Sequence, residues 1–131
     1  MTHRRTLVIL TFTVIAGGLV WSQFVSTMLD DVRLVSITIT PEDEQPAVLR
    51  EYAERFQASE KWLFLTGARA EITKLANDGF WLSAGSPVPV THSEKFVLVD
   101  REGKIRGFFD GNKAESVPQL VEAIDGLIRT K

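Results

Sequence analysis

The sequence predicts one globular domain of the α/β class, preceded by a transmembrane helix. Stretches rich in β-branched residues alternate along the chain with stretches whose apolar residues recur at helical spacing, and this alternation builds layered α/β folds. Of the 131 residues, 44% are hydrophobic, which is enough for one ordinary core. A long uncharged run near the N-terminus indicates the transmembrane helix. We therefore expect a membrane anchor over residues 1–27 and an α/β domain over residues 28–131.

The predicted anchor rests on the run from Thr6 to Leu29, which contains no charged residue. A membrane-spanning helix needs about 20 mainly apolar residues, and the arginines Arg4 and Arg5 directly before the run favour a cytoplasmic N-terminus. The domain then lies on the periplasmic or an equivalent extracytoplasmic side. Because no small-x-small cleavage site follows the apolar core, we expect an uncleaved anchor rather than a signal peptide.

The same run allows a second interpretation, in which it belongs to a soluble domain. The letters LVILTFT are β-branched and aromatic enough for a buried strand, AGG can form a turn, and LVWSQFVSTML can form a short packed helix. A surface helix normally carries charges on its wet face, and this segment has none, which favours the membrane interpretation. Residues 6–24 cannot span a membrane and supply a core strand at once.

The middle of the chain predicts two strands, each followed by a helix. VRLVSITIT (32–40) is typical of a strand covered on both faces, and Pro41 ends it. PEDEQPAVLREYAERFQAS (41–59) predicts an amphipathic helix whose acidic residues lie in the first turn, where the helix dipole favours them. KWLFLTG (61–67) predicts a short strand, and ARAEITKLANDG (68–79) a second helix with Gly79 as its C-cap.

The C-terminal part predicts a loop, a hairpin and a helix. SAGSPVPVTHSEK (83–95) is rich in Ser, Gly and Pro and reads as a loop. KFVLV and KIRGFFD predict antiparallel strands joined by DREG, in which Gly103 supplies the positive φ of a tight turn. SVPQLVEAIDGLIRT predicts a helix with Ser116 as the candidate N-cap. Its expected buried stripe consists of Leu120, Val121, Ile124, Leu127 and Ile128.

Three stretches together are more specific than any short motif: DVRLVSITITPEDEQPAVLREYAERF, WLFLTG and HSEKFVLVDREGKIRGFFDG. In wording and order they resemble the SCO/SenC family of membrane-anchored, thioredoxin-like proteins that help load copper into cytochrome c oxidase. The resemblance runs from about Asp31 to the C-terminus. It implies a thioredoxin-like domain associated with copper delivery to the oxidase. The implied partners are the membrane and either a cytochrome c oxidase subunit or an intact SCO-like paralogue.

The resemblance also implies a copper site, which this chain holds only in part. Family members bind copper through two cysteines in a Cys-x-x-x-Cys loop and one later histidine, and the histidine corresponds to His92. The sequence contains no cysteine, so either the loop is missing or VIAGG (14–18) is a degenerate version of it. Copper(I) selects thiolate and thioether ligands, which one imidazole does not replace. A second departure is Thr40, where the family tends to have an aspartate before the proline. We therefore expect no tightly bound copper.

In thioredoxin-like folds, the strand before the cysteine loop lies in the middle of the sheet, between the strands that correspond to VRLVSIT and KFVLV. If residues 6–24 lie in the membrane, that strand is missing, so we expect an incomplete thioredoxin-like fold. Two half-sheets would then pair directly, recruit another chain or leave unpaired edges.

Several function classes are excluded by composition. A net charge of −2 offers no basic field for nucleic acid, and the absence of cysteine excludes thiol catalysis and disulfide exchange. Glu42, Asp43 and Glu44 suggest an acid–base or hard-metal site. Carboxylates at the start of a helix, however, ordinarily serve to satisfy its unpaired N–H groups. We expect no enzyme. The alternatives are a non-catalytic protein-binding module and the product of a decayed gene.

Overall fold

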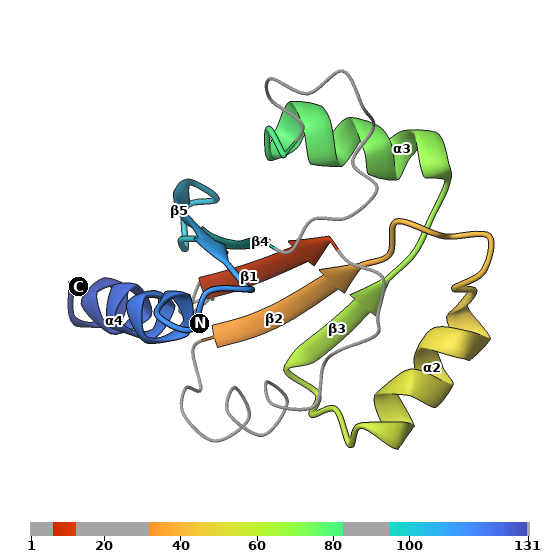
Figure 1. Cartoon of the computed structure of the whole chain (residues 1–131), viewed down its shortest axis with the longest axis horizontal. Coiled ribbons are helices and arrows are strands. Elements are labelled where there is room, and N and C mark those ends of the chain that lie inside the picture. The colour runs from red at the N-terminus through yellow and green to blue at the C-terminus, as the bar shows by residue number, and fades with distance from the viewer. Residues whose placement is uncertain (1–6, 13–31, 83–94, 131) are drawn as a thin grey trace, which may run out of the picture.

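The computed structural model describes residues 7–12, 32–82 and 95–130, which form a five-stranded sheet with helices on both faces (Figure 1). The strands are β1 (Leu7–Phe12), β2 (Val32–Ile37), β3 (Trp62–Leu65), β4 (Lys95–Val99) and β5 (Ile105–Asp110). The helices are α2 (Pro46–Arg55), α3 (Arg69–Lys74) with a π-helical extension η1 (Leu75–Gly79), and α4 (Ser116–Arg129). The α/β class predicted from the sequence is confirmed.

The strand order is β3-β2-β1-β4-β5. Strands β1, β2 and β3 are parallel, whereas β4 is antiparallel to β1 and β5 is antiparallel to β4. Strand β1 is therefore central: Ile9 pairs with Leu34 of β2 on one side and with Leu98 of β4 on the other. This is the position between the VRLVSIT and KFVLV strands that we expected to be empty.

The expectation of a missing central strand is wrong, because residues 7–12 fill that position as β1. The same residues cannot form part of a transmembrane helix while they pair on both sides in the sheet, so the strand interpretation of LVILTF holds. Within 7–12, 32–82 and 95–130, no helix has the length and apolar character needed to cross a membrane. The rest of the predicted anchor, residues 1–6 and 13–27, lies outside the described residues.

Two clusters of apolar side chains hold the helices on the sheet. On one face Leu34 and Leu98 pack with Leu120 and Ile124 of α4, and Tyr52 of α2 adjoins the same cluster. On the other face β2 packs with α3 in a cluster of Val35, Ile37, Ile39, Ile72 and Ala76. The period-2 alternation along β2 supplies both clusters, since successive side chains point to opposite faces. Every sheet residue of both clusters is at most 8% exposed.

Three predicted helix ends differ from the structure. Helix α2 begins at Pro46, with Gln45 as the N-cap, because proline is suited to the first helical position. Helix α4 begins one residue earlier than predicted, so Ser116 is its first residue and Glu115 the N-cap. Gly79 does not cap α3, since η1 continues the helix to Gly79 and Phe80 follows as the cap. The predicted turn at Gly103 is confirmed by its φ of 80°.

Candidate functional site

The candidate site is the edge of the sheet where the three parallel strands end. In α/β folds this edge is the usual location of binding sites, because loops from several strands meet there. Strand β4 begins at the same edge, since Thr11 near the end of β1 pairs with Phe96 near the start of β4. The described part of this edge consists of residues 38–45, which follow β2, and residues 66–69, which follow β3 and lead into α3.

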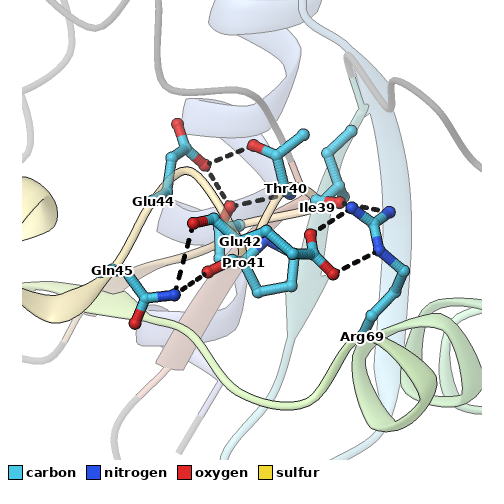
Figure 2. Close-up of polar contacts among 8 residues, drawn as sticks. Ile39, Thr40, Pro41, Glu42, Glu44, Gln45 and Arg69 are labelled. Carbon is cyan, nitrogen blue, oxygen red and sulfur yellow. Dashed lines mark hydrogen bonds and ion pairs between the residues drawn. The ribbon is translucent and has the colours of Figure 1, made fainter.

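Two threonine hydroxyls hold Glu44 over the end of β2 (Figure 2). The buried Thr38 donates its hydroxyl to Glu44 Oε2, and the hydroxyl of Thr40 donates to the same oxygen at 3.2 Å. Thr38 Oγ1 also accepts the backbone N–H of Thr40 at 3.0 Å. Hydroxyls that are removed from bulk water need an acceptor, and the Glu44 carboxylate accepts from both. Glu44 therefore fixes the path of the loop.

A second carboxylate of the loop, that of Glu42, is bound by Arg69 at the start of α3 (Figure 2). Arg69 Nε donates to Glu42 Oε1 at 2.8 Å, and a terminal guanidinium nitrogen contacts Oε2. The other terminal nitrogen donates to the backbone oxygen of Ile39 at 3.3 Å. This bidentate pair joins the loop after β2 to the helix after β3. Its side chains remain 57% and 58% exposed, so water screens the attraction.

The predicted role of the acidic residues in the first turn of a helix is wrong. Residues 41–44 form a turn before α2, and the first turn of α2 contains no acidic residue. The turn is closed by the backbone N–H groups of Asp43 and Glu44, which donate to Thr40 O at 3.0 and 2.9 Å. The Gln45 side-chain amide donates to Pro41 O at 2.7 Å. Proline at the helix start leaves the carboxylates outside the helix, and Glu42 and Glu44 bind side chains instead of helical N–H groups.

The ion pair changes the acidity of its partners. The Arg69 guanidinium lowers the pKa of Glu42 below its ordinary value, and backbone hydrogen bonding acts in the same direction. The hydrogen bond to Glu42 raises the pKa of Arg69 in turn. Because the folded-state pKa of Glu42 is depressed, the pair contributes its stabilisation above the ordinary pKa of a glutamate. The contribution is lost as the pH falls through the folded-state pKa.

A second polar cluster lies in the β4–β5 hairpin turn, at the end of the sheet where the parallel strands begin. Asp100, 8% exposed, accepts the backbone N–H groups of Glu102 at 2.8 Å and Lys104 at 2.9 Å. Arg106 Nε donates to its other oxygen at 2.5 Å. The backbone N–H of Lys104, followed by the Arg106 side chain, lowers the pKa of Asp100. The cluster shapes the turn and takes no part in the candidate site.

The described residues include no cluster of three or more histidine, cysteine or acidic side chains able to hold a metal ion. Glu42 and Glu44 point to different partners, Arg69 and the threonine hydroxyls, so they do not converge on one ion. His92, the predicted copper ligand, lies outside the described residues, as does the VIAGG segment (14–18). The described part of the site is therefore a loop whose shape is fixed by the contacts of Glu42 and Glu44.

The roles of Thr38 and Arg69 at this edge were not predicted from the sequence. Thr38 stands inside a β-branched run, where a threonine reads as a strand former. Arg69 follows a glycine turn and reads as a solvated helix residue. The sequence nevertheless contained a signal for the Glu42–Arg69 ion pair. Arg69 begins a helix directly after a parallel strand, and the neighbouring strand leads into an acidic loop at the same end of the sheet.

Comparison with known proteins identifies relatives of the chain. The sequence model of the family described as SCO1/SenC matches residues 19–129. A SCO1 protein homolog of Bacillus subtilis is 33% identical over 93 residues, which are 67% of this chain and 47% of that protein. The chain therefore spans about half the length of this curated relative.

Solved structures share the fold. BsSco, described as a member of the Sco family of cytochrome c oxidase assembly proteins, superposes with a TM-score of 0.76 at 22% identity, covering 96% of this chain and 82% of that chain. Yeast Sco1 with copper bound superposes with a TM-score of 0.67 at 24% identity, covering 95% and 79%. At these identities the likeness establishes a shared fold, and the predicted thioredoxin-like architecture is confirmed through it.

Proposed function

The chain belongs to the SCO1/SenC family, and from this membership we propose that it takes part in copper delivery during the assembly of cytochrome c oxidase. The observation that carries the proposal is the family match over residues 19–129. It is supported by the structural likeness to copper-bound yeast Sco1 and to BsSco, an oxidase assembly protein by description.

Within that process, the proposed role is to bind a protein partner rather than to hold copper tightly or to act as an enzyme. The sequence has no cysteine, and copper(I) draws its affinity in proteins from sulfur ligands. In the described loop after β2, the carboxylates Glu42 and Glu44 are engaged by Arg69 and by two threonine hydroxyls. The proposed partner is a copper-receiving oxidase subunit or a cysteine-containing SCO-like paralogue.

The proposed location is the extracytoplasmic side of the membrane, where we place the partner as well. Leu7–Phe12 pair in the middle of the sheet, so those residues do not cross the bilayer. Extraction of membranes at alkaline pH tests how the chain is held at the membrane. A peripheral protein enters the supernatant, whereas a chain that spans the bilayer stays in the pellet.

The proposed function is tested by gene disruption and rescue in the organism that carries the chain. Disruption should lower cytochrome c oxidase activity and the copper content of the oxidase, and the wild-type chain should restore both. The His92→Ala variant should rescue as well as the wild type, because the proposed role does not need copper ligation by this chain. A disruption that leaves the copper content unchanged would contradict the proposal, and a failed His92→Ala rescue would restore the copper-ligand role of His92.

A gain-of-function variant tests the degenerate-site interpretation in the test tube. Val14 and Gly18 have the spacing of the family's two cysteines, soon after β1 ends, and His92 precedes β4 by three positions. The wild type should lose copper(I) to a competing chelator. Val14→Cys combined with Gly18→Cys should retain it about a hundredfold better, because two thiolates are added. The same pair combined with His92→Ala is the matched control, and tight copper binding by the wild type would contradict the interpretation.

A further inference from the structure

Strand β3 forms one edge of the sheet (Figure 1). Two of its leucines are exposed. Within the described part of the chain, β3 pairs with β2 on one side and with no strand on the other. Leu63 and Leu65 are 40% and 47% exposed, although both lie in a strand. An edge strand with exposed apolar side chains is a template for pairing with another strand unless charges or a covering element protect it.

The two faces of β3 differ in their covering. Trp62 and Phe64 point to the face where α2 packs, and their rings contact the ring of Tyr52 with centroid distances of 6.4 and 5.6 Å. The Trp62 indole is also fixed by a hydrogen bond to Ser36 Oγ at 2.9 Å. Leu63 and Leu65 point to the opposite face, because side chains alternate along a strand. The exposed leucines therefore form a short apolar row on one face of an ordered strand.

The backbone of β3 shows which groups are directed to the open edge. Leu34 N–H donates to Lys61 O at 2.9 Å and Thr38 N–H donates to Leu65 O at 3.0 Å, so the odd-numbered residues of β3 bond to β2. The N–H and C=O groups of Phe64 consequently point outward. The Trp62 N–H donates to Ser59 O at 2.9 Å, which leaves only the C=O of Trp62 free to extend a ladder. A new strand would gain a short ladder centred on Phe64.

We propose that β3 is a contact between two copies of this chain, paired antiparallel about a two-fold axis at Phe64. In this register Phe64 lies opposite Phe64 of the second copy, where the two residues exchange both backbone hydrogen bonds. Leu63 lies opposite Leu65 of the second copy as a non-hydrogen-bonded pair, in which the Cα atoms and side chains are closer together. A two-fold axis repeats that leucine contact on the other side, so the surface is complementary to itself.

Charge favours a second copy as the occupant. The residues from Trp62 to Ala68 carry no charge, so pairing brings no like charges together along the strand. Of the flanking charges, Lys61 falls opposite the neutral Gly67 in this register, and Arg69 belongs to α3 and lies outside the ladder. The partner that fits is therefore an extended, uncharged, apolar strand with an open edge of its own, and β3 is such a strand in every copy of the chain.

The contact is small, so we expect a weak dimer that forms with rising protein concentration. Two four-residue strands bury less surface than a standard stable interface. Sedimentation equilibrium of the full chain should give a monomer–dimer equilibrium. Leu63→Lys combined with Leu65→Lys should raise the dissociation constant at least about tenfold, because charges are placed opposite each other on the paired edge. Phe108→Lys is the matched control: Phe108 is 45% exposed on β5, the other edge strand.

The absence of cysteine allows a direct test of the register. A non-hydrogen-bonded antiparallel pair has Cα atoms about 4.5 Å apart, within the range that a disulfide bridges. Mixed Leu63→Cys and Leu65→Cys chains, oxidised with copper–phenanthroline, should form a cross-linked heterodimer at least about fivefold faster than either chain alone. Circular dichroism of each variant shows that the fold is retained.

Three results would overturn the proposal. A chain that stays monomeric at every concentration has no such contact. A dimer weakened by Phe108→Lys and not by the leucine substitutions pairs through β5. Equal cross-linking of Leu63→Cys with itself and with Leu65→Cys excludes the register. None of these readouts depends on copper binding by the chain or on the proposed role in oxidase assembly.

Discussion

A proline at Ile9 is the sharpest perturbation of the fold, because β1 was predicted to be in the membrane and is found in the centre of the sheet. Ile9 lies between Leu34 of β2 and Leu98 of β4, and its backbone N–H and C=O both point to β2, because Leu34 N–H donates to Lys61 O on the far side. Proline removes the N–H and is not accommodated in the interior of a sheet. In a spanning helix, by contrast, proline is tolerated.

The expected loss of stability follows from the backbone hydrogen bonds that proline removes. One backbone hydrogen bond is worth about 1 kcal/mol, and leaving its buried acceptor unpaired costs about 1–3 kcal/mol more. We therefore expect Ile9→Pro to lower the free energy of unfolding by about 3 kcal/mol, a large part of the roughly 5–15 kcal/mol of an ordinary domain. With a urea dependence of about 1–3 kcal/mol per molar, the unfolding midpoint should fall by about 1–3 M.

Urea unfolding followed by tryptophan fluorescence measures this shift, because Trp62 is buried at 8% exposure and becomes solvated on unfolding. Ile9→Val is the control, since it keeps both hydrogen bonds and a β-branched side chain. If Ile9→Pro unfolds at the same urea concentration as the wild type, β1 does not pair in the sheet. That result would support the interpretation of the N-terminal run as a membrane-spanning helix.

Three further changes test the core, a buried hydrogen bond and the hairpin. Leu98→Ala should cost about 2–5 kcal/mol in urea unfolding, because Leu98 is fully buried and the truncation leaves a cavity; a cost under about 1 kcal/mol would contradict the described packing. Ser36→Ala should cost about 1–3 kcal/mol and alter the fluorescence of Trp62, whose indole N–H loses its acceptor, whereas unchanged fluorescence would contradict the contact. Asp100→Asn should lower stability at pH 7 and flatten its decline in acid. The depressed pKa of Asp100 makes its contribution complete above the ordinary aspartate value of 3.8 and lost as the pH falls through the folded-state pKa, so an unchanged pH profile would contradict this role.

The sequence determined the α/β class, the strands from residue 32 onward and the family. Runs such as VRLVSI and KFVLV have the local composition of buried strands, and the helical spacing of Leu120 and Ile124 identified the face of α4 that packs on the sheet. These features depend on side chains close together in the sequence, so periodicity reports them directly. The glycine turn at Gly103 belongs to the same group, because one positive φ decides it.

The tertiary structure decided the place of the N-terminal run and the arrangement of the candidate site. A run that is apolar on all sides suits both a spanning helix and a strand paired on both sides, and only the partners β2 and β4 select between them. The partners of Glu42 and Glu44 also depend on folding, because Arg69 is 27 residues from Glu42 and is brought to it by the parallel pairing of β2 with β3. Long-range pairing leaves no periodic signal in the sequence, so it becomes visible only when the sheet is assembled.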